Sequence, residues 1–211
     1  ATDIEDGHLG AQASWRSSRD GILGTGASLV VPALTSGTHT ITASVTDAGG
    51  KTATATRTFV VNATPVVTIT APAAATRVEP ATPITFTATA TDVEDGALAA
   101  QIAWSSSRDG ALGTGASLTR SLSSGVHTIT AQVSDHGGKT GQAMVVLTVN
   151  AMPHLTITAP LSGAWIDPGA ATTLSATATD TEDGDVAAHV AWSSSRDGAL
   201  GSGASLSLTT L

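Results

Sequence analysis

The chain has 211 residues, a formal net charge of −8 and no cysteine, and only 3% of its residues are aromatic. The negative charge argues against nucleic acids and anionic membrane surfaces as partners, and the lack of cysteine excludes a scaffold braced by disulfides. No apolar run reaches the roughly 18 residues of a membrane-spanning helix, so we expect no membrane insertion in this segment.

An internal repeat organises the chain. The motif Asp-x-Glu-Asp-Gly begins at Asp3, returns 89 residues later at Asp92, and returns after a further 88 residues at Asp180. A period of this length indicates tandem modules of about 88 residues, each large enough to bury a core. A repeated module favours a structural or multivalent role over a single catalytic site.

Alignment on the motif divides the chain into three parts. Residues 1–62 form a partial repeat that lacks its first two strands, residues 63–150 form a complete repeat, and residues 151–211 form a partial repeat that lacks its last strands. Two explanations stay open. The chain is an excerpt of a longer array, or its end repeats are completed by neighbouring subunits, since exposed sheet edges recruit strands.

In the complete repeat, apolar residues alternate with threonines, which predicts β-strands with one apolar face. The acidic turn that begins at Asp92 follows the second strand, and Trp104 lies on the third. Gly-rich turns separate the later strands. The expected strands cover residues 67–71, 84–91, 102–106, 117–122, 127–134 and 142–149.

About seven short strands around one central Trp, with turn signals every 8–12 residues, are typical of an antiparallel β-sandwich. The segments between modules, such as residues 62–65, are only a few residues long, so the modules should stack as a semi-rigid rod. The sequence therefore predicts an all-β chain of tandem antiparallel β-sandwich modules arranged end to end.

The motif Gly-x-His-Thr-Ile-Thr-Ala-x-Val-(Thr/Ser)-Asp-x-Gly-Gly occurs at residues 37–50 and 125–138. It resembles the late strands of bacterial Ig-like and polycystic-kidney-disease-type (PKD) repeats, and the acidic turn followed by Trp is similar too. Two departures are clear. Trp104 is followed by Ser-Ser-Ser-Arg-Asp-Gly where PKD modules typically have Asp-Phe-Gly-Asp-Gly, and His39 and His127 stand where these modules often have Tyr.

The resemblance implies an Ig-like, PKD-like or cadherin-like module from a secreted or cell-surface protein. In PKD-type and cadherin-like modules, acidic residues of this turn can bind calcium near the junction with the preceding module. Asn62, near a linker, is a further candidate ligand. The candidate calcium ligands in the turns are Asp3, Glu5, Asp6, Asp92, Glu94, Asp95, Asp180, Glu182 and Asp183.

The residues themselves leave the acidic turns open to two interpretations. Carboxylates that lie close together repel one another, and a hard cation such as Ca²⁺ relieves that repulsion. Alternatively, each turn is solvated, its Asp accepts hydrogen bonds from its own backbone, and its Gly supplies a positive φ. The motif is not an EF-hand, because Ala103 occupies the position of the required Glu.

Ser106, His127 and Asp135 are the residue types of a hydrolase triad. His127 and Asp135 lie eight residues apart on one expected strand, so about 26 Å separates them at about 3.3 Å per residue. A triad needs hydrogen-bond contact. We therefore expect no enzyme activity, no catalytic residue and a structural His127.

The four tryptophans fall into two groups. Trp15, Trp104 and Trp192 occupy one repeated position and should lie in sandwich cores, with a sugar-stacking platform as the alternative. Trp165 aligns with Arg77 in the first turn of its module. We expect it to contact a neighbouring module or another chain.

Together these features predict an extracellular structural protein, a shaft, stalk or filament on a bacterial surface. Further copies of itself would be its partners, with cell-surface glycans or proteins as additional ones, and Ca²⁺ would be its one cofactor. The alternative is an adhesin or carbohydrate-binding region, or a spacer of a secreted hydrolase.

Overall fold

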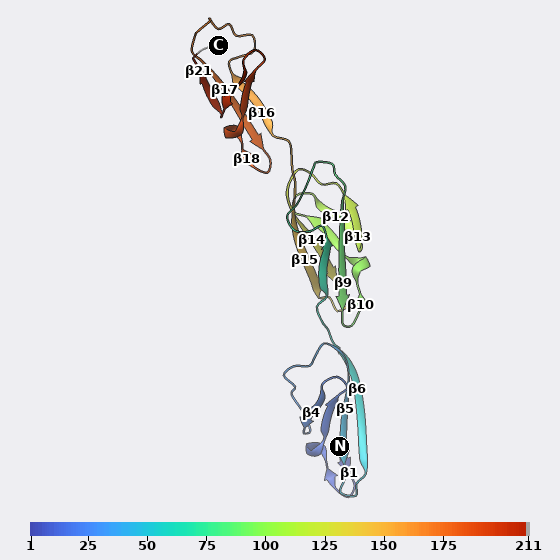
Figure 1. The fold of residues 1–211 in the computed structure, drawn as a ribbon. Coiled ribbons are helices and arrows are strands. Elements are labelled where there is room, and N and C mark those ends of the chain that lie inside the picture. The colour runs from blue at the N-terminus through green and yellow to red at the C-terminus, as the bar shows by residue number, and fades with distance from the viewer. Residues whose placement is uncertain (210–211) are drawn as a thin grey trace.

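The computed structural model describes residues 1–209 and consists of strands, turns and three single-turn 3₁₀ helices. Figure 1 shows three small β modules arranged end to end, which confirms the predicted fold class. None of the helices in residues 1–209 has the length and apolar character required to span a membrane.

The complete module is a sandwich of two sheets. In the first sheet the central strand β9 (Ile84–Asp92) pairs with β7 (Val66–Ala71), β10 (Gly96–Ala97) and β13 (Ser117–Arg120). The second sheet has the order β12 (Gly110–Thr114), β11 (Ala103–Ser106), β14 (Gly125–Ser134), β15 (Thr140–Val149) and β8 (Thr76–Val78), and the helix η2 (Ala99–Gln101) joins the two sheets.

The core of this module lies between the two sheets. The alternation along β9 buries Phe86, and Trp104 on β11 lies opposite with 1% of its surface exposed. Their rings are 5.7 Å apart and tilted by 44°. Ile102, Ile129 and Leu147 are fully buried around them, so one contiguous apolar core holds the sheets together.

The first module contains one large sheet. Its strands are β1 (Thr2–Asp3), β2 (Gly7–His8), β3 (Ser14–Ser17), β4 (Gly21–Thr25), β5 (Gly37–Thr46) and β6 (Thr52–Val61), with the helix η1 (Gly10–Gln12). The sheet order is β4-β3-β5-β6, which corresponds to β12-β11-β14-β15. Because counterparts of β7, of β8 and of all but the last two residues of β9 are not among residues 1–62, Leu9 is the one buried apolar residue in this range.

The third module has a different subset of the strands. It consists of β16 (His154–Ala159), β17 (Thr172–Asp180), β18 (Gly184–Asp185), β19 (Ala191–Ser194), β20 (Gly198–Ser202) and β21 (Ser205–Leu208), with the helix η3 (Ala187–His189). These strands correspond to β7, β9, β10, β11, β12 and β13. A small core forms around Trp192, and no counterpart of β14 or β15 lies in residues 151–209.

Two strands differ from the sequence-based expectations. The segment 110–114, which the glycines indicated as a turn and loop, is the edge strand β12, with a register shift opposite Trp104. The strand β8 pairs with β15 in parallel, so the second sheet is not purely antiparallel. Both strands are short and lie at sheet edges, where glycine and a nearby proline are tolerated.

Candidate functional site

The acidic turns connect the first sheet of each module to its helical turn. In the complete module, Asp92 Oδ1 accepts hydrogen bonds from the N–H groups of Glu94 (2.9 Å) and Asp95 (3.1 Å). Gly96 then has a φ of 72°, which glycine adopts without strain. Asp3 and Asp180 make the same pair of bonds, so this Asp fixes its own turn in all three copies.

The Glu of the turn reaches the linker that precedes its module. Glu94 Oε2 accepts the N–H of Ala63 at 2.8 Å, and Glu182 Oε2 accepts the N–H of Ala151 at 2.8 Å. A carboxylate that accepts a backbone N–H forms one of the stronger hydrogen bonds in proteins. The same contact therefore holds both linkers.

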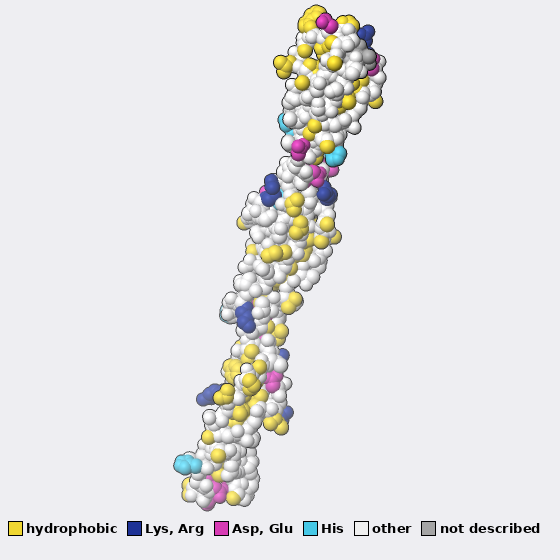
Figure 2. Space-filling model, turned by 90° about the vertical axis from the view of Figure 1, so that its left-hand side faces the viewer, with side chains coloured by type: hydrophobic (Ala, Val, Ile, Leu, Met, Phe, Trp, Pro, Cys, Tyr) yellow, Lys and Arg dark blue, Asp and Glu magenta, His cyan; other side chains and the backbone are white. Residues whose placement is uncertain are grey.

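The last Asp of the turn holds the hairpin at the same end of the module. Asp95 Oδ2 accepts the N–H of His136 at 2.7 Å, and Asp6 Oδ2 accepts the N–H of Ala48 at 2.8 Å. The three carboxylates of the turn, which are Asp92, Glu94 and Asp95 in the complete module, thus have three roles. We call this set of carboxylates the carboxylate clamp. In Figure 2 acidic side chains gather near the ends of the modules.

Asn62 binds the hairpin and not the acidic turn. Its Nδ2 donates to Asp135 Oδ2 at 2.9 Å, and its carbonyl oxygen accepts from Lys139 Nζ at 2.7 Å. A side chain at Gly137 would collide with the Asn62 amide, and one at Gly141 would collide with the carbonyl oxygen of Pro65. The linker therefore packs directly on the hairpin, and its backbone at Pro65 leaves no room for a side chain at Gly141, whereas the Asn62 side chain could move away from one at Gly137.

Sequence reasoning missed the role of this hairpin, although a signal was present. The string Asp-x-Gly-Gly-Lys-Thr occurs at residues 47–52 and again at 135–140. In both copies the Asp accepts the N–H of the following Lys through its side chain, at 2.7 Å in the first and 2.8 Å in the second. The contacts between this hairpin and the linker come in addition to that bond, and they can form only where another module precedes the hairpin.

The second junction contains a cation from the upstream module. Arg77 Nη1 donates to Asn150 Oδ1 at 3.0 Å. Hydrogen bonds from the N–H groups of Glu182 and Asp183 lower the pKa of Asp180, and the charge of Arg77 lowers it further. Trp165 occupies the corresponding place in the third module and is fully exposed in residues 1–209, so its expected contact stays a prediction.

The clamps leave some carboxylate oxygens without donors. Among the described residues, Asp92 Oδ2, Glu94 Oε1 and Glu182 Oε1 are buried and have no hydrogen-bond partner. Such oxygens are suited to a hard cation, and the two carboxylates of each pair lie close enough to interact. Within residues 1–209, however, no group of three or more His, Cys, Asp or Glu side chains is arranged to hold a metal ion. The fit to Ca²⁺ is therefore limited to two carboxylates per turn.

The clamps should weaken in acid. Burial raises the pKa of Asp92, but hydrogen bonds from Glu94 and Asp95 outweigh it and leave the pKa below its ordinary 3.8. The stability that this Asp contributes is thus complete above about pH 4 and is lost as the pH falls through the lower folded-state pKa. At pH values below about 4, we expect the melting temperature of the chain to fall. Asp92→Asn, which keeps an acceptor oxygen but does not titrate, should flatten that fall, and an unchanged acid profile would contradict the assignment.

The fold brings together Ser106 and His127, two of the three residues that the sequence offered as a triad, but it places them in the protein interior. Ser106 Oγ lies 2.8 Å from His127 Nδ1, and His127 Nε2 lies 2.7 Å from the carbonyl oxygen of Ser123. Because a carbonyl oxygen only accepts, Nε2 carries a proton and donates to Ser123, while Nδ1 shares a hydrogen bond with the Ser106 hydroxyl. The nearby carboxylate belongs to Asp109, at 4.0 Å, and not to Asp135.

Burial determines what this pair can do. His127 has no exposed surface, and Ser106 also accepts the N–H groups of Arg108 and Asp109. His39 and Ser17 repeat the arrangement in the first module at 2.7 Å. The pair ties the third strand to the long strand, as the structural interpretation of His127 predicts.

The repeated tryptophans face the sandwich interiors. Trp104 and Trp192 are buried, and Trp15 is half-buried because its module has one large sheet. Each indole Nε1 donates to a glycine carbonyl oxygen eleven residues later, at 2.8 to 2.9 Å. The core interpretation of Trp104 is therefore confirmed, and the sugar-stacking alternative is wrong for this residue.

No family model and no curated protein matches the chain. Similar solved structures include fibronectin(III)-like modules of Clostridium thermocellum CbhA, with 15% identity, a TM-score of 0.38, and coverage of 66% of this chain and 77% of that one. Dpr2 Ig1-Ig2 in complex with DIP-Theta Ig1-Ig3 has 15% identity, a TM-score of 0.43 and coverages of 94% and 79%. Human CDH23 EC21-23 has 16% identity, a TM-score of 0.37 and coverages of 100% and 86%. Likenesses of this strength concern architecture and assign no function.

Proposed function

We propose that the chain is a non-enzymatic structural segment, a rod of tandem Ig-like modules that acts as an extracellular shaft or spacer. The observation that carries this proposal is the repeated linker contact, Ala63 to Glu94 and Ala151 to Glu182. A linker that only connected modules would need no such contact. A linker clamped by a carboxylate restricts bending, which is what a shaft requires.

The mechanism is mechanical. Each long hairpin, such as β14 with β15, pairs over ten residues and resists extension. Each linker is short and bonded to the module that follows, so bending is limited to a few backbone torsions. The net negative charge keeps separate chains apart until a specific contact forms.

Calcium is a second part of the proposal. The unpartnered oxygens of Asp92 and Glu94 favour a cation at the first junction, and that of Glu182 favours one at the second. Glu94 and Glu182 would bind it while still accepting the linker N–H, and a bound Ca²⁺ would supply positive charge that offsets the repulsion between the paired carboxylates.

A bacterial cell surface is the proposed location. Copies of the same chain are the proposed partners, with surface glycans or proteins as the alternative for a binding region.

Small-angle X-ray scattering of the full chain tests the rod. We expect an extended wild-type particle, and a shorter maximum dimension with more flexible profiles for Glu94→Ala with Glu182→Ala. Glu79→Ala removes an exposed carboxylate outside the clamps and is the matched control. Equal profiles for all three proteins would refute the clamp.

The same series with Ca²⁺ and with a chelator tests the cation. Stiffening and a raised melting temperature with Ca²⁺ should disappear in Asp92→Ala with Asp95→Ala. If Ca²⁺ changes nothing in the wild-type chain, the turns act through hydrogen bonds alone.

Strand completion is a second candidate function. The first module presents an uncovered sheet, and β16 of the third module exposes Leu155 and Ile157. Unpaired strands and apolar faces of this kind recruit strands from other chains. Self-association of the chain in sedimentation experiments would favour this candidate over a monomeric rod.

A further inference from the structure

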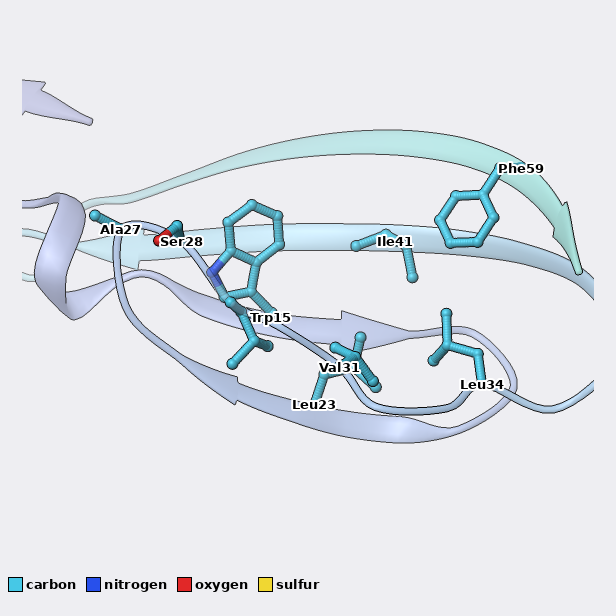
Figure 3. A pocket seen from close by; sticks show the side chains of 9 residues that line it. Trp15, Leu23, Ala27, Ser28, Val31, Leu34, Ile41 and Phe59 are labelled. Atoms are coloured by element: carbon cyan, nitrogen blue, oxygen red, sulfur yellow. The ribbon is translucent and has the colours of Figure 1, made fainter.

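Tension along the chain would cross the complete module from one linker to the other. Figure 1 shows the first linker entering this module at one end and the second linker leaving it at the opposite end. The first linker, residues 62–65, follows β6, which pairs with β5 over ten residues. Figure 3 shows these two strands side by side, next to the open groove that Trp15, Ile41 and Phe59 line. The linker is therefore firmly attached on its upstream side.

The shortest route for this tension along the chain itself runs through β7 and β8. The linker continues into β7, an edge strand of the first sheet, and the chain then passes to β8 in the second sheet. The strand β8 pairs in parallel with β15, and the last residue of β15, Val149, leads to the second linker. On this route the tension must pass from β8 to β15 through hydrogen bonds.

The contact between β8 and β15 is short. Three residue pairs join the two strands, residues 76–78 opposite residues 147–149. One more bond, of 2.9 Å, runs from the N–H of Ala75 to the carbonyl oxygen of Val146. Because the strands are parallel and would be pulled from opposite ends, tension slides one along the other. A few bonds of modest strength would then bear all of it.

The docked linker provides a second route that avoids this contact. Asn62 Nδ2 donates to Asp135 Oδ2 at 2.9 Å, and Lys139 Nζ donates to the carbonyl oxygen of Asn62 at 2.7 Å. Asp135 and Lys139 lie in the hairpin turn that leads directly into β15. Tension from Asn62 can thus enter the start of β15 and follow its covalent backbone to Val149.

The hairpin turn is a firm anchor for this second route. Asp135 is buried, its N–H donates to the carbonyl oxygen of Lys139 at 2.9 Å, and its Oδ1 accepts the N–H of Lys139 at 2.8 Å. The strand β15 itself pairs with β14 over ten residues. Each bond to Asn62 involves a charged side chain, and such hydrogen bonds are among the stronger ones.

We infer that the docked linker divides tension between two routes, one through β7 and β8 and one through the hairpin turn into β15. The side-chain bonds at Asn62 then shield the short contact between β8 and β15 from the full tension. This inference rests on the proposed shaft function and identifies the part of the shaft that resists stretching. The complete module can unfold under tension only after these bonds break, so they add a step to its unfolding.

Single-molecule measurements at fixed force test the two routes on the full chain, which has no cysteine of its own to compete for the attachment of handles. In the linker geometry the handles are attached at Val60→Cys and Met152→Cys, so the tension enters through Asn62. In the strand geometry Thr68→Cys replaces Val60→Cys, so the tension enters β7 beyond the docked linker. All three positions are exposed.

The unmodified linker is compared with the double variant Asn62→Ala with Lys139→Ala. In the linker geometry we expect the complete module of the double variant to unfold about tenfold faster, because two hydrogen bonds no longer have to break first. In the strand geometry the two proteins should unfold at equal rates, which also shows that the double variant is folded. Lys51→Ala, the same change in the hairpin of the first module, is the matched control and should alter neither rate.

Equal rates in the linker geometry would overturn the inference. The same ratio of rates in both geometries would overturn it as well, because the bonds would then stabilise the module without transmitting tension. An extended particle in X-ray scattering together with equal rates would reject this inference and leave the shaft in place. A flexible particle together with the expected difference in rates would reject the shaft and support the second route.

Discussion

We expect Trp104→Ala to reduce the free energy of unfolding of the complete module by about 3–5 kcal/mol. The indole is 1% exposed and packs against Phe86 across the two sheets. Its removal leaves a cavity and also leaves the carbonyl oxygen of Gly115 without its donor. Hydrogen exchange read out over residues 63–150 measures the loss for this module alone.

Trp15→Ala is the matched control for this change. Trp15 makes the same bond, to the carbonyl oxygen of Gly26, but it is half-buried at the wall of the open groove. The cost should be less than half of that at Trp104, because far less surface returns to water. Equal losses at the two positions would mean that the second sheet adds nothing to the packing of the indole.

The second large effect is expected at the first junction. Gly141→Ala should cost about 1–3 kcal/mol, the range for overpacking, because the new methyl group would collide with the carbonyl oxygen of Pro65. The strand itself does not need glycine, since Ala53 occupies the same place on β6. We expect the linker to leave the hairpin, with loss of the bond from Lys139 to Asn62.

Nuclear magnetic resonance of the full chain measures this effect through the Asn62 and Lys139 signals and through residual dipolar couplings of the modules. Ala53→Gly is the control and should leave the orientation of the modules unchanged. If Gly141→Ala keeps both the Asn62 signals and the module orientation, the linker does not depend on this close contact.

The sheets could be predicted because period-two alternation determines which face of a strand is buried. The alternation along residues 84–91 and 127–134 placed Phe86 and Ile129 in the core, where they are found. The edge strands β8 and β12 could not be predicted in this way. Only three to five residues long, they are held by pairing with neighbours and not by a pattern of their own.

The acidic turn could be predicted only in part. The hydrogen bonds that Asp92 accepts within its own turn follow from local chain geometry, and the solvated-turn interpretation included them. The contact of Glu94 with Ala63 joins residues 31 positions apart and depends on how the linker enters the module. Likewise, the strand geometry separated His127 from Asp135. It could not indicate that Asp109 lies near His127, because Asp109 is in the turn between β11 and β12 and the contact depends on how β11 pairs with β14.

The linker contacts give the first junction a direction. Asn62 ends the first module and Ala63 follows it in the linker, but both donate hydrogen bonds to the second module, to Asp135 and Glu94. Unfolding of the second module would release this linker at once, whereas unfolding of the first would leave the linker docked on the second. The first junction is therefore mechanically polar, whereas at the second junction Arg77 and Val78 of the upstream module also form hydrogen bonds with Asn150.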